Sequence, residues 1–349
     1  MKDLLTSGFQ VFQYKKIDLG VNVLKKSIPV LAILVILSLV LAACGANNNG
    51  NKGANSATNT PASETPATDA PTEITVKHQL GETVVPVNPS KVVVFDYGTL
   101  DTLDKLGVEV ASLPQASVPA YLEKFKDAKY VNAGSLKEPD FEKINETAPD
   151  LIIISGRQQD AYEELTKIAP TIFMGVDNKN FMESFTTNVK TLAQIFSKEA
   201  EADTELAAIN DSIKSLNEKA TASGKNGLII LANEGAISAY GKASRFGIIH
   251  DVFGIPAVDE NIKVSTHGDP VTFEYVAEKD ADYLFVVDRN AVTEGSGDAH
   301  SSVENALVKN TKAYKEGNIV YLNPDFWYLS GGGLISVAEM VKEIDAAIK

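Results

Sequence analysis

Beyond residue 72, short apolar runs alternate with stretches in which apolar residues recur at helical spacing. Runs of three or four apolar residues between such stretches are typical of buried β-strands in folds that alternate strands and helices. The pattern therefore predicts an α/β fold with mostly parallel sheets. The expected strands are 92–95, 151–154, 171–173, 228–231, 284–287 and 319–322.

A long and mostly polar helix is expected near the middle of the chain. Its apolar residues form a single stripe along one face, and the pattern ends close to Gly224. A helix with so much polar surface suits a bridge between two lobes. We therefore expect an N-terminal lobe over 73–197, a bridging helix over 198–224 and a C-terminal lobe over 225–349. The stripe consists of Leu206, Ile209, Ile213 and Leu216.

An internal repeat relates the two halves of the chain. The segment 141–157 recurs at 273–289, with a phenylalanine, two glutamates, an aspartate and an arginine at identical positions. A weaker similarity relates 104–108 to 251–255. A repeat of this length indicates two copies of one structural unit. We therefore predict two Rossmann-like lobes, each with a mostly parallel sheet, joined by the long bridging helix.

The repeated arginines, Arg157 and Arg289, each follow a predicted strand. In an open α/β sheet, ligands bind at the carboxyl ends of the strands, so both guanidinium groups are expected to face a cleft shared by the lobes. A single arginine is more often a solvated surface residue, but its recurrence at the same strand end favours a ligand role. Arg245 opens a helical stretch that runs to Phe253. Either its side chain bends away from the helix, or arginine and helix end bind an anion together.

The first 43 residues have the features of a secretory signal. Lys25 and Lys26 precede an apolar run over 28–43, which is short for a membrane-spanning helix, and Cys44 follows a Leu-Ala-Ala sequence. This arrangement predicts cleavage and lipidation at Cys44; the alternative is a signal anchor with an incidental cysteine. Residues 1–23 lie ahead of the signal, which suggests that translation begins near 21–24. Residues 44–72, rich in Asn, Thr, Ala and Ser, are expected to form a disordered spacer.

Composition narrows the range of partners. The formal net charge of −14 opposes binding to nucleic acid and to anionic lipid, so an anionic ligand would need a local cluster of positive charge. The single cysteine excludes a disulfide within the chain and cysteine-ligated metal clusters. Four scattered histidines give weak support for a zinc site.

The segments SGRQ, KASRFG, STHG, VVDRN and FWYLSGGG, with the lipidation site, the spacer and the long helix, resemble the helical-backbone class of ABC-importer binding proteins. Within that class the likeness is greatest to ferric-petrobactin-binding lipoproteins of Gram-positive bacteria and their catecholate relatives. The resemblance implies a rigid, monomeric binding protein, lipid-anchored at the extracytoplasmic face of the cell membrane. Its transported ligand would be a ferric catecholate-type siderophore, with no permanent cofactor.

The resemblance also implies roles for particular residues. Arg157, Arg245 and Arg289 would surround the catecholate oxygens with charge-assisted hydrogen bonds. His267 and Tyr328 match positions that complete the iron coordination shell in relatives; if the siderophore supplies six donors, they would only line the pocket.

Three further residues have two interpretations each. Trp327 is either core packing or a flat wall for catechol rings. Glu142 and Glu274 match glutamates that dock relatives onto the two permease subunits. Alternatively, they simply favour the dipole of a helix in its first turn.

Other classes of function fit the sequence less well. An enzyme would need a nucleophile–base pair or a cofactor fingerprint, and neither is recognisable, so we expect no catalysis. A binding protein for bare zinc or manganese would need three or four convergent ligands, of which only His267 can be nominated. Haem, a corrinoid or another iron chelate remain alternatives within the same fold. A tethered adhesin would leave the duplicated arginines unexplained.

Overall fold

The computed structural model describes residues 71–293, 295 and 299–349. Cys44, the expected signal over 1–43 and nearly all of the expected spacer lie outside these residues. Of the helices that are described, none combines the length and the apolar character needed to cross a membrane.

The N-terminal lobe contains a five-stranded sheet in the order β5-β4-β3-β6-β7, in which every pairing is parallel. Its central strands β3 and β6 are apolar and completely buried, as strands covered on both faces require. A two-stranded antiparallel hairpin, β1–β2, precedes the sheet. The strands are β1 Glu73–His78, β2 Gly81–Pro86, β3 Val92–Val94, β4 Ser112–Leu113, β5 Val131–Asn132, β6 Leu151–Ile154 and β7 Thr171–Phe173. The helices are α1 Tyr97–Lys105, η1 Ala120–Lys126, α2 Phe141–Thr147, η2 Gly156–Ala161, α3 Tyr162–Leu165, η3 Asn178–Asn180 and α4 Phe181–Phe196.

The C-terminal lobe contains a second five-stranded sheet, in the order β10-β9-β8-β11-β12. Strands β8, β11 and β12 are parallel, whereas β9 and β10 pair antiparallel. The strands are β8 Gly227–Asn233, β9 Ala236–Tyr240, β10 Asp269–Val271, β11 Tyr283–Asp288 and β12 Ile319–Leu322. The helices are α6 Ile248–Asp251, α7 Phe273–Lys279, α8 Asn290–Thr293, α9 Ala299–Val303, η4 Val308–Asn310, α10 Lys312–Lys315, η5 Asp325–Ser330 and α11 Leu334–Ala347.

The antiparallel pair β8–β9 has a local cause. Glu234 and Gly235 join the two strands and have positive φ values of 52° and 80°. Two consecutive residues with positive φ form the tight turn that suits a hairpin. In the N-terminal lobe, helix α1 separates β3 from β4, so those strands run parallel. The expected α/β class with two Rossmann-like lobes is confirmed, and the second lobe differs from the first by this hairpin.

The sequence repeat corresponds to a structural repeat. Helices α2 and α7 each end at a residue in the left-handed region, Ala148 at φ 48° and Asp280 at φ 44°, and each is followed by an inner strand of its sheet. The repeated Asp150 and Asp282 accept hydrogen bonds from backbone N–H groups that precede β3 and β8, respectively. The shared residues therefore build the same local structure in both lobes.

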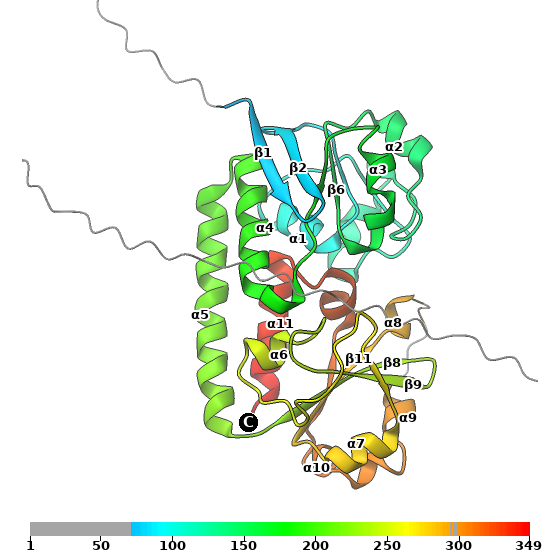
Figure 1. Cartoon of the computed structure of the whole chain (residues 1–349), viewed down its shortest axis with the longest axis vertical. Coiled ribbons are helices and arrows are strands. Elements are labelled where there is room, and N and C mark those ends of the chain that lie inside the picture. The colour runs from blue at the N-terminus through cyan, green and yellow to red at the C-terminus, as the bar shows by residue number, and fades with distance from the viewer. Residues whose placement is uncertain (1–70, 294, 296–298) are drawn as a thin grey trace, which may run out of the picture. The chain divides into compact units, whose positions relative to one another are not determined.

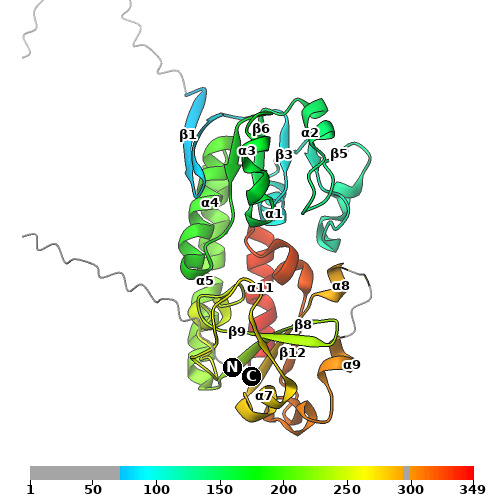
Figure 2. The same cartoon turned by 45° about the vertical axis from the view of Figure 1, so that its right-hand side comes forward.

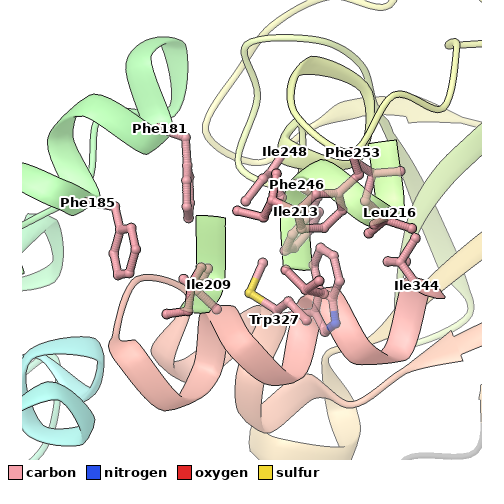
Figure 3. Packing of buried hydrophobic residues seen from close by; sticks show 14 of the residues in the cluster. Phe181, Phe185, Ile209, Ile213, Leu216, Phe246, Ile248, Phe253, Trp327 and Ile344 are labelled. Atoms are coloured by element: carbon pink, nitrogen blue, oxygen red, sulfur yellow. The ribbon is translucent and has the colours of Figure 1, made fainter. Parts of the chain in front are cut away.

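Helix α5, Glu199–Ser223, lies alongside both lobes (Figure 1). Its range falls within the expected 198–224, and it ends where Gly224 adopts a positive φ of 63°. The predicted apolar stripe is buried against α4, α11 and the C-terminal lobe, as Figure 3 shows for Ile209, Ile213 and Leu216.

A second connection between the lobes is made by the C-terminal segment. The first backbone N–H groups of a helix have no partner within it. At α11 they are bound by side chains of α1: Ile335 N and Ser336 N donate to Asp101 at 3.2 and 3.0 Å, and Leu334 N donates to Thr102 Oγ1 at 3.1 Å. Part of the expected C-terminal lobe, 225–349, is thus fixed to the N-terminal lobe, with α11 lying next to α1 (Figure 1, Figure 2).

Asp101 gives a prediction about stability and pH. Burial raises the pKa of its carboxyl to about 7, although hydrogen bonds from Ser336, Tyr121 and Ile335 oppose the rise. The folded protein therefore keeps this proton between about pH 4 and pH 7, where the unfolded chain loses it, so this group makes the free energy of unfolding fall as pH rises through that window. We expect the wild type to lose as much as about 4 kcal/mol relative to Asp101→Asn across it. Urea denaturation of both proteins at a series of pH values measures the difference. A difference independent of pH would contradict the prediction.

Candidate functional site

The three arginines of the chain converge on one residue, Tyr328. Arg157 lies in η2, just after β6, and Arg289 directly follows β11. Arg245 lies in the turn before α6, and Tyr328 lies in η5. Four separate segments, drawn from both lobes, therefore meet at this point. All four residues were predicted as site residues from the sequence, but the arginines were expected around a ligand and not around Tyr328.

The guanidinium groups contact opposite ends of the tyrosine. Arg157 Nη2 donates to the Tyr328 backbone oxygen at 2.9 Å, and Arg245 Nη2 donates to the same oxygen. Arg289 Nε donates to the Tyr328 hydroxyl at 3.1 Å. The Arg245 guanidinium carbon also lies 4.2 Å from the centre of the Tyr328 ring, within the range of a cation–π contact. The tyrosine is therefore held at its backbone, its ring face and its hydroxyl.

The carbonyl oxygens that accept these bonds come from a single turn of π-helix. Element η5 closes with a bond from Gly331 N to Phe326 O, 2.7 Å long. The last carbonyls of a helix have no intrahelical donor, and those of Tyr328 and Leu329 accept from Arg157 and Arg245 instead. Single π-helical turns occur frequently at functional sites. This turn supplies neutral acceptors for two neighbouring cations.

Among the described residues, no carboxylate neutralises the positive charge of the cluster. All three arginines are half-buried, and none of them forms an ion pair with a carboxylate in the part of the chain that is described. Burial, together with the charge of Arg157, lowers the pKa of Arg245. Like charges held this close favour the binding of an anion, which would relieve their repulsion.

The same charges act on the Tyr328 phenol. Partial burial disfavours its ionisation, but the hydrogen bond from Arg289 and the charges of Arg245, Arg289 and Arg157 outweigh that effect and lower its pKa. A phenol that ionises more readily is a better ligand for a hard metal ion such as ferric iron. Tyr328 is therefore suited to contact either an anionic ligand or a metal that the ligand carries.

Two residues of the site were missed by sequence reasoning. Asn233, the last residue of β8, accepts a hydrogen bond from Arg289 Nη1 through its side-chain oxygen. Tyr240, at the end of β9, is buried. Burial raises the pKa of its phenol, and the charge of Arg245 opposes this rise. The position of Asn233 at a strand end beside β11 could have indicated it. Tyr240 carries no comparable sequence signal.

Trp327 belongs to the core. Its side chain is 2% exposed and packs among apolar residues of α5, α6 and α11, as Figure 3 shows. Its indole N–H donates to Glu343 Oε2 at 2.6 Å. The burial of the ring favours the interpretation of Trp327 as core packing, and its role as a wall of the ligand site stays a prediction.

His267 lies on the exposed segment before β10. The neighbouring Gly268 packs so closely on Tyr240 that a Cβ there would approach the ring to 2.6 Å, which places the STHG turn beside the wall of the cluster. Among the described residues, no group of three or more histidine, cysteine or acidic side chains could hold a metal ion. The role of His267 as an iron ligand stays a prediction.

Arg245 does not lie at the end of a long helix. Helix α6 has only four residues, so the idea that a helix end binds an anion together with Arg245 is not supported; the arginine lies in the turn before α6.

Glu142 and Glu274 are exposed in the first turns of α2 and α7, and a hydrogen bond from Thr272 lowers the pKa of Glu274. Their repeat-related placement leaves both the docking and the dipole interpretation open.

A surface hollow of about 650 Å³ lies elsewhere, between the end of α1 and the segment from η1 to β5. Its charged side chains pair with one another, as Lys124 does with Asp104 and Lys129 with Glu109. No residue of the arginine cluster lines it, so we do not regard it as the ligand site.

Comparison with known proteins identifies relatives along most of the chain. The sequence is 49% identical over 323 residues to the petrobactin-binding protein YclQ of Bacillus subtilis, covering 91% of this chain and 98% of YclQ. The crystal structure of YclQ matches with a TM-score of 0.78 and 53% identity, covering 79% of this chain and 99% of that one. The ferric-anguibactin-binding protein FatB of Vibrio anguillarum is 31% identical over 280 residues, covering 78% of this chain and 87% of FatB.

A structure from another organism agrees. The periplasmic catecholate-siderophore binding protein VctP of Vibrio cholerae matches with a TM-score of 0.75 and 35% identity, covering 78% of this chain and 99% of that one. Residues 92–326 match the family described as periplasmic binding protein. The resemblance inferred from the sequence is thereby confirmed, and the chain belongs to the periplasmic-binding-protein family.

Proposed function

We propose that this chain is the lipid-anchored, extracytoplasmic binding protein of an ABC importer, and that it captures a ferric catecholate-type siderophore of the petrobactin kind. The observation that carries the proposal is the convergence of three arginines, without carboxylate partners among the described residues, on Tyr328. The class of ligand is supported by the relatives, because YclQ is a petrobactin-binding protein, FatB a ferric-anguibactin-binding protein and VctP a catecholate-siderophore binding protein.

The chemistry of the cluster fits catecholate oxygens. These oxygens are anionic, and a guanidinium presents five N–H donors in a rigid fork. The contacts of Arg245 and Arg289 within the protein occupy only some of these donors, so others can bind a ligand. Hydrogen bonds to charged groups contribute about 1.5–3 kcal/mol each. A negative chelate would also supply the counter-charge that no described residue provides.

Tyr328 could also contact the iron that such a chelate carries. If the siderophore provides fewer than six donors, the phenol of Tyr328, with its lowered pKa, is the first protein ligand that we propose, and His267 is the second. If the siderophore provides six, both residues act as walls of the site. No group of three or more histidine, cysteine or acidic side chains among the described residues could hold bare zinc or manganese, and a bare metal ion is kept as an alternative ligand in the test below. Haem and other iron chelates are the alternatives to test.

Transport would also require contacts outside the ligand site. We propose that Glu142 and Glu274 dock onto the two permease subunits, because the repeat gives each lobe one exposed glutamate at the same place. Lipidation of Cys44 would hold the protein near the permease. Arginines without a paired general base favour binding over catalysis, so we propose no enzymatic activity.

The ligand class can be tested with the single tryptophan. Trp327 precedes Tyr328 in η5, so its emission should respond when a ligand changes the arginine cluster. We expect saturable quenching by ferric petrobactin and by a ferric bis-catecholate. Ferric citrate, a ferric hydroxamate, haem and zinc should act weakly or not at all. Saturable quenching by haem or zinc alone would contradict the proposed ligand.

Replacing the arginines should weaken binding. We expect Arg157→Ala, Arg245→Ala and Arg289→Ala each to raise the Kd for ferric petrobactin about tenfold or more, because each removes at least one charge-assisted hydrogen bond. Titration calorimetry measures the Kd. Lys309→Ala, which removes a charge from η4, serves as the control and should leave the Kd unchanged. Wild-type affinity in all three arginine variants would refute the triad.

Reversing the docking glutamates should separate uptake from binding. We expect the double variant Glu142→Lys and Glu274→Lys to bind ligand normally but to abolish iron uptake in cells, because the variant reverses the charge at both proposed docking points. The matched control replaces Glu146 and Glu278, which are also exposed and related by the same repeat, one turn further along α2 and α7. Normal uptake with the first pair replaced would exclude the docking role.

A further inference from the structure

Asn233 and Arg289 are neighbours at the same edge of the C-terminal sheet. Strands β8 and β11 pair in parallel, with Asp288 opposite Ala232, so the next residues along the two strands are Arg289 and Asn233. A backbone bond of 3.1 Å from Arg289 N to Ala232 O continues the ladder to this point. The backbone therefore fixes where both side chains begin.

The Arg289 guanidinium is held by two neutral oxygens. Its Nη1 donates to the side-chain oxygen of Asn233, and its Nε donates to the Tyr328 hydroxyl at 3.1 Å. Because the guanidinium is planar and rigid, two bonds from different nitrogens fix its orientation. Its other N–H groups have no protein partner among the described residues. They remain for a ligand.

A carboxylate in place of Asn233 would form a stronger bond but would cancel the charge of Arg289. Neither of the acidic residues next to the pair in sequence, Asp288 and Glu234, forms an ion pair with Arg289 in the described part of the chain. Asp288 accepts backbone bonds on both oxygens, from Asn290 N at 3.0 Å and Ala299 N at 2.9 Å, and Glu234 is exposed. An uncharged acceptor at position 233 thus orients the arginine and leaves its charge available.

We propose that Asn233 is a positioning residue of the ligand site, which holds Arg289 against the Tyr328 hydroxyl without neutralising it. The consequence for ligand affinity rests on the proposed function. The consequence for the Tyr328 phenol does not, because Arg289 lowers the pKa of Tyr328 in the protein alone.

The test compares Asn233→Asp and Asn233→Ala with the wild type. The ionisation of Tyr328 is followed by ultraviolet absorbance in the protein without ligand, and Tyr328→Phe identifies its contribution among the 11 tyrosines. We expect the pKa of Tyr328 to rise in both variants, and more in Asn233→Asp, where the new carboxylate also opposes the phenolate. The Kd for ferric petrobactin should rise about tenfold or more in Asn233→Asp, the loss expected when one charge-assisted contact is removed, and less in Asn233→Ala.

Asn310→Asp is the matched control, because it adds the same charge at an exposed position of the same lobe. It should change neither the pKa of Tyr328 nor the Kd. If Tyr328 titrates alike in the wild type and in Asn233→Asp, the positioning role is wrong, even if the variant is less stable. If the pKa of Tyr328 rises as expected in the variants but the wild type binds none of the ferric chelates, the positioning role is confirmed and the proposed ligand is wrong.

Discussion

The structure around Tyr328 must stabilise three half-buried guanidinium groups that carry the same charge. Charges of the same sign repel most strongly where water is partly excluded, so such a cluster persists only if other groups stabilise it. Here the stabilising groups are neutral: backbone oxygens of η5, the tyrosine hydroxyl and ring, and the Asn233 amide. In a chain of net charge −14, this arrangement keeps one positive site open to an anion.

The position of Tyr328 depends on both lobes. Its π-helical turn belongs to the C-terminal segment, but that segment is fixed to the N-terminal lobe. Asp101 binds the first N–H groups of α11, and the Tyr121 hydroxyl lies 2.7 Å from Ser330 Oγ. Gly98 allows the two segments to approach, since a Cβ at this position would lie 2.8 Å from the backbone oxygen of Ser330. Helix α5 and the C-terminal segment therefore make two connections, which together hold Arg157 opposite the two arginines of the other lobe.

The features predicted well from the sequence are those with local causes. The strands are short apolar runs, α5 has one apolar stripe and a terminal glycine, and the repeat located Arg157 and Arg289 at matching strand ends. Contacts between distant segments could not be predicted in this way. The capping of α11 by α1 and the π-turn of η5 arise from tertiary structure, and the antiparallel β9 follows from a tight turn at Glu234 and Gly235 that the apolar pattern did not indicate. Trp327 of the π-turn lies in the core, and its neighbour Tyr328 contacts the arginines.

The use of arginine at the site has a physical basis, and the contrast with the rest of the chain is already visible in the composition. Every other one of the 32 lysine and arginine residues is a lysine, and lysine supplies the positive partner in surface ion pairs such as those with Glu82, Asp345 and Glu260. In a half-buried cluster of like charges, a lysine would lose its proton readily, whereas arginine stays charged and binds oxygen pairs through its fork. Three permanent charges and their planar donors therefore favour a ligand that is anionic and presents oxygens in pairs, as a ferric catecholate does.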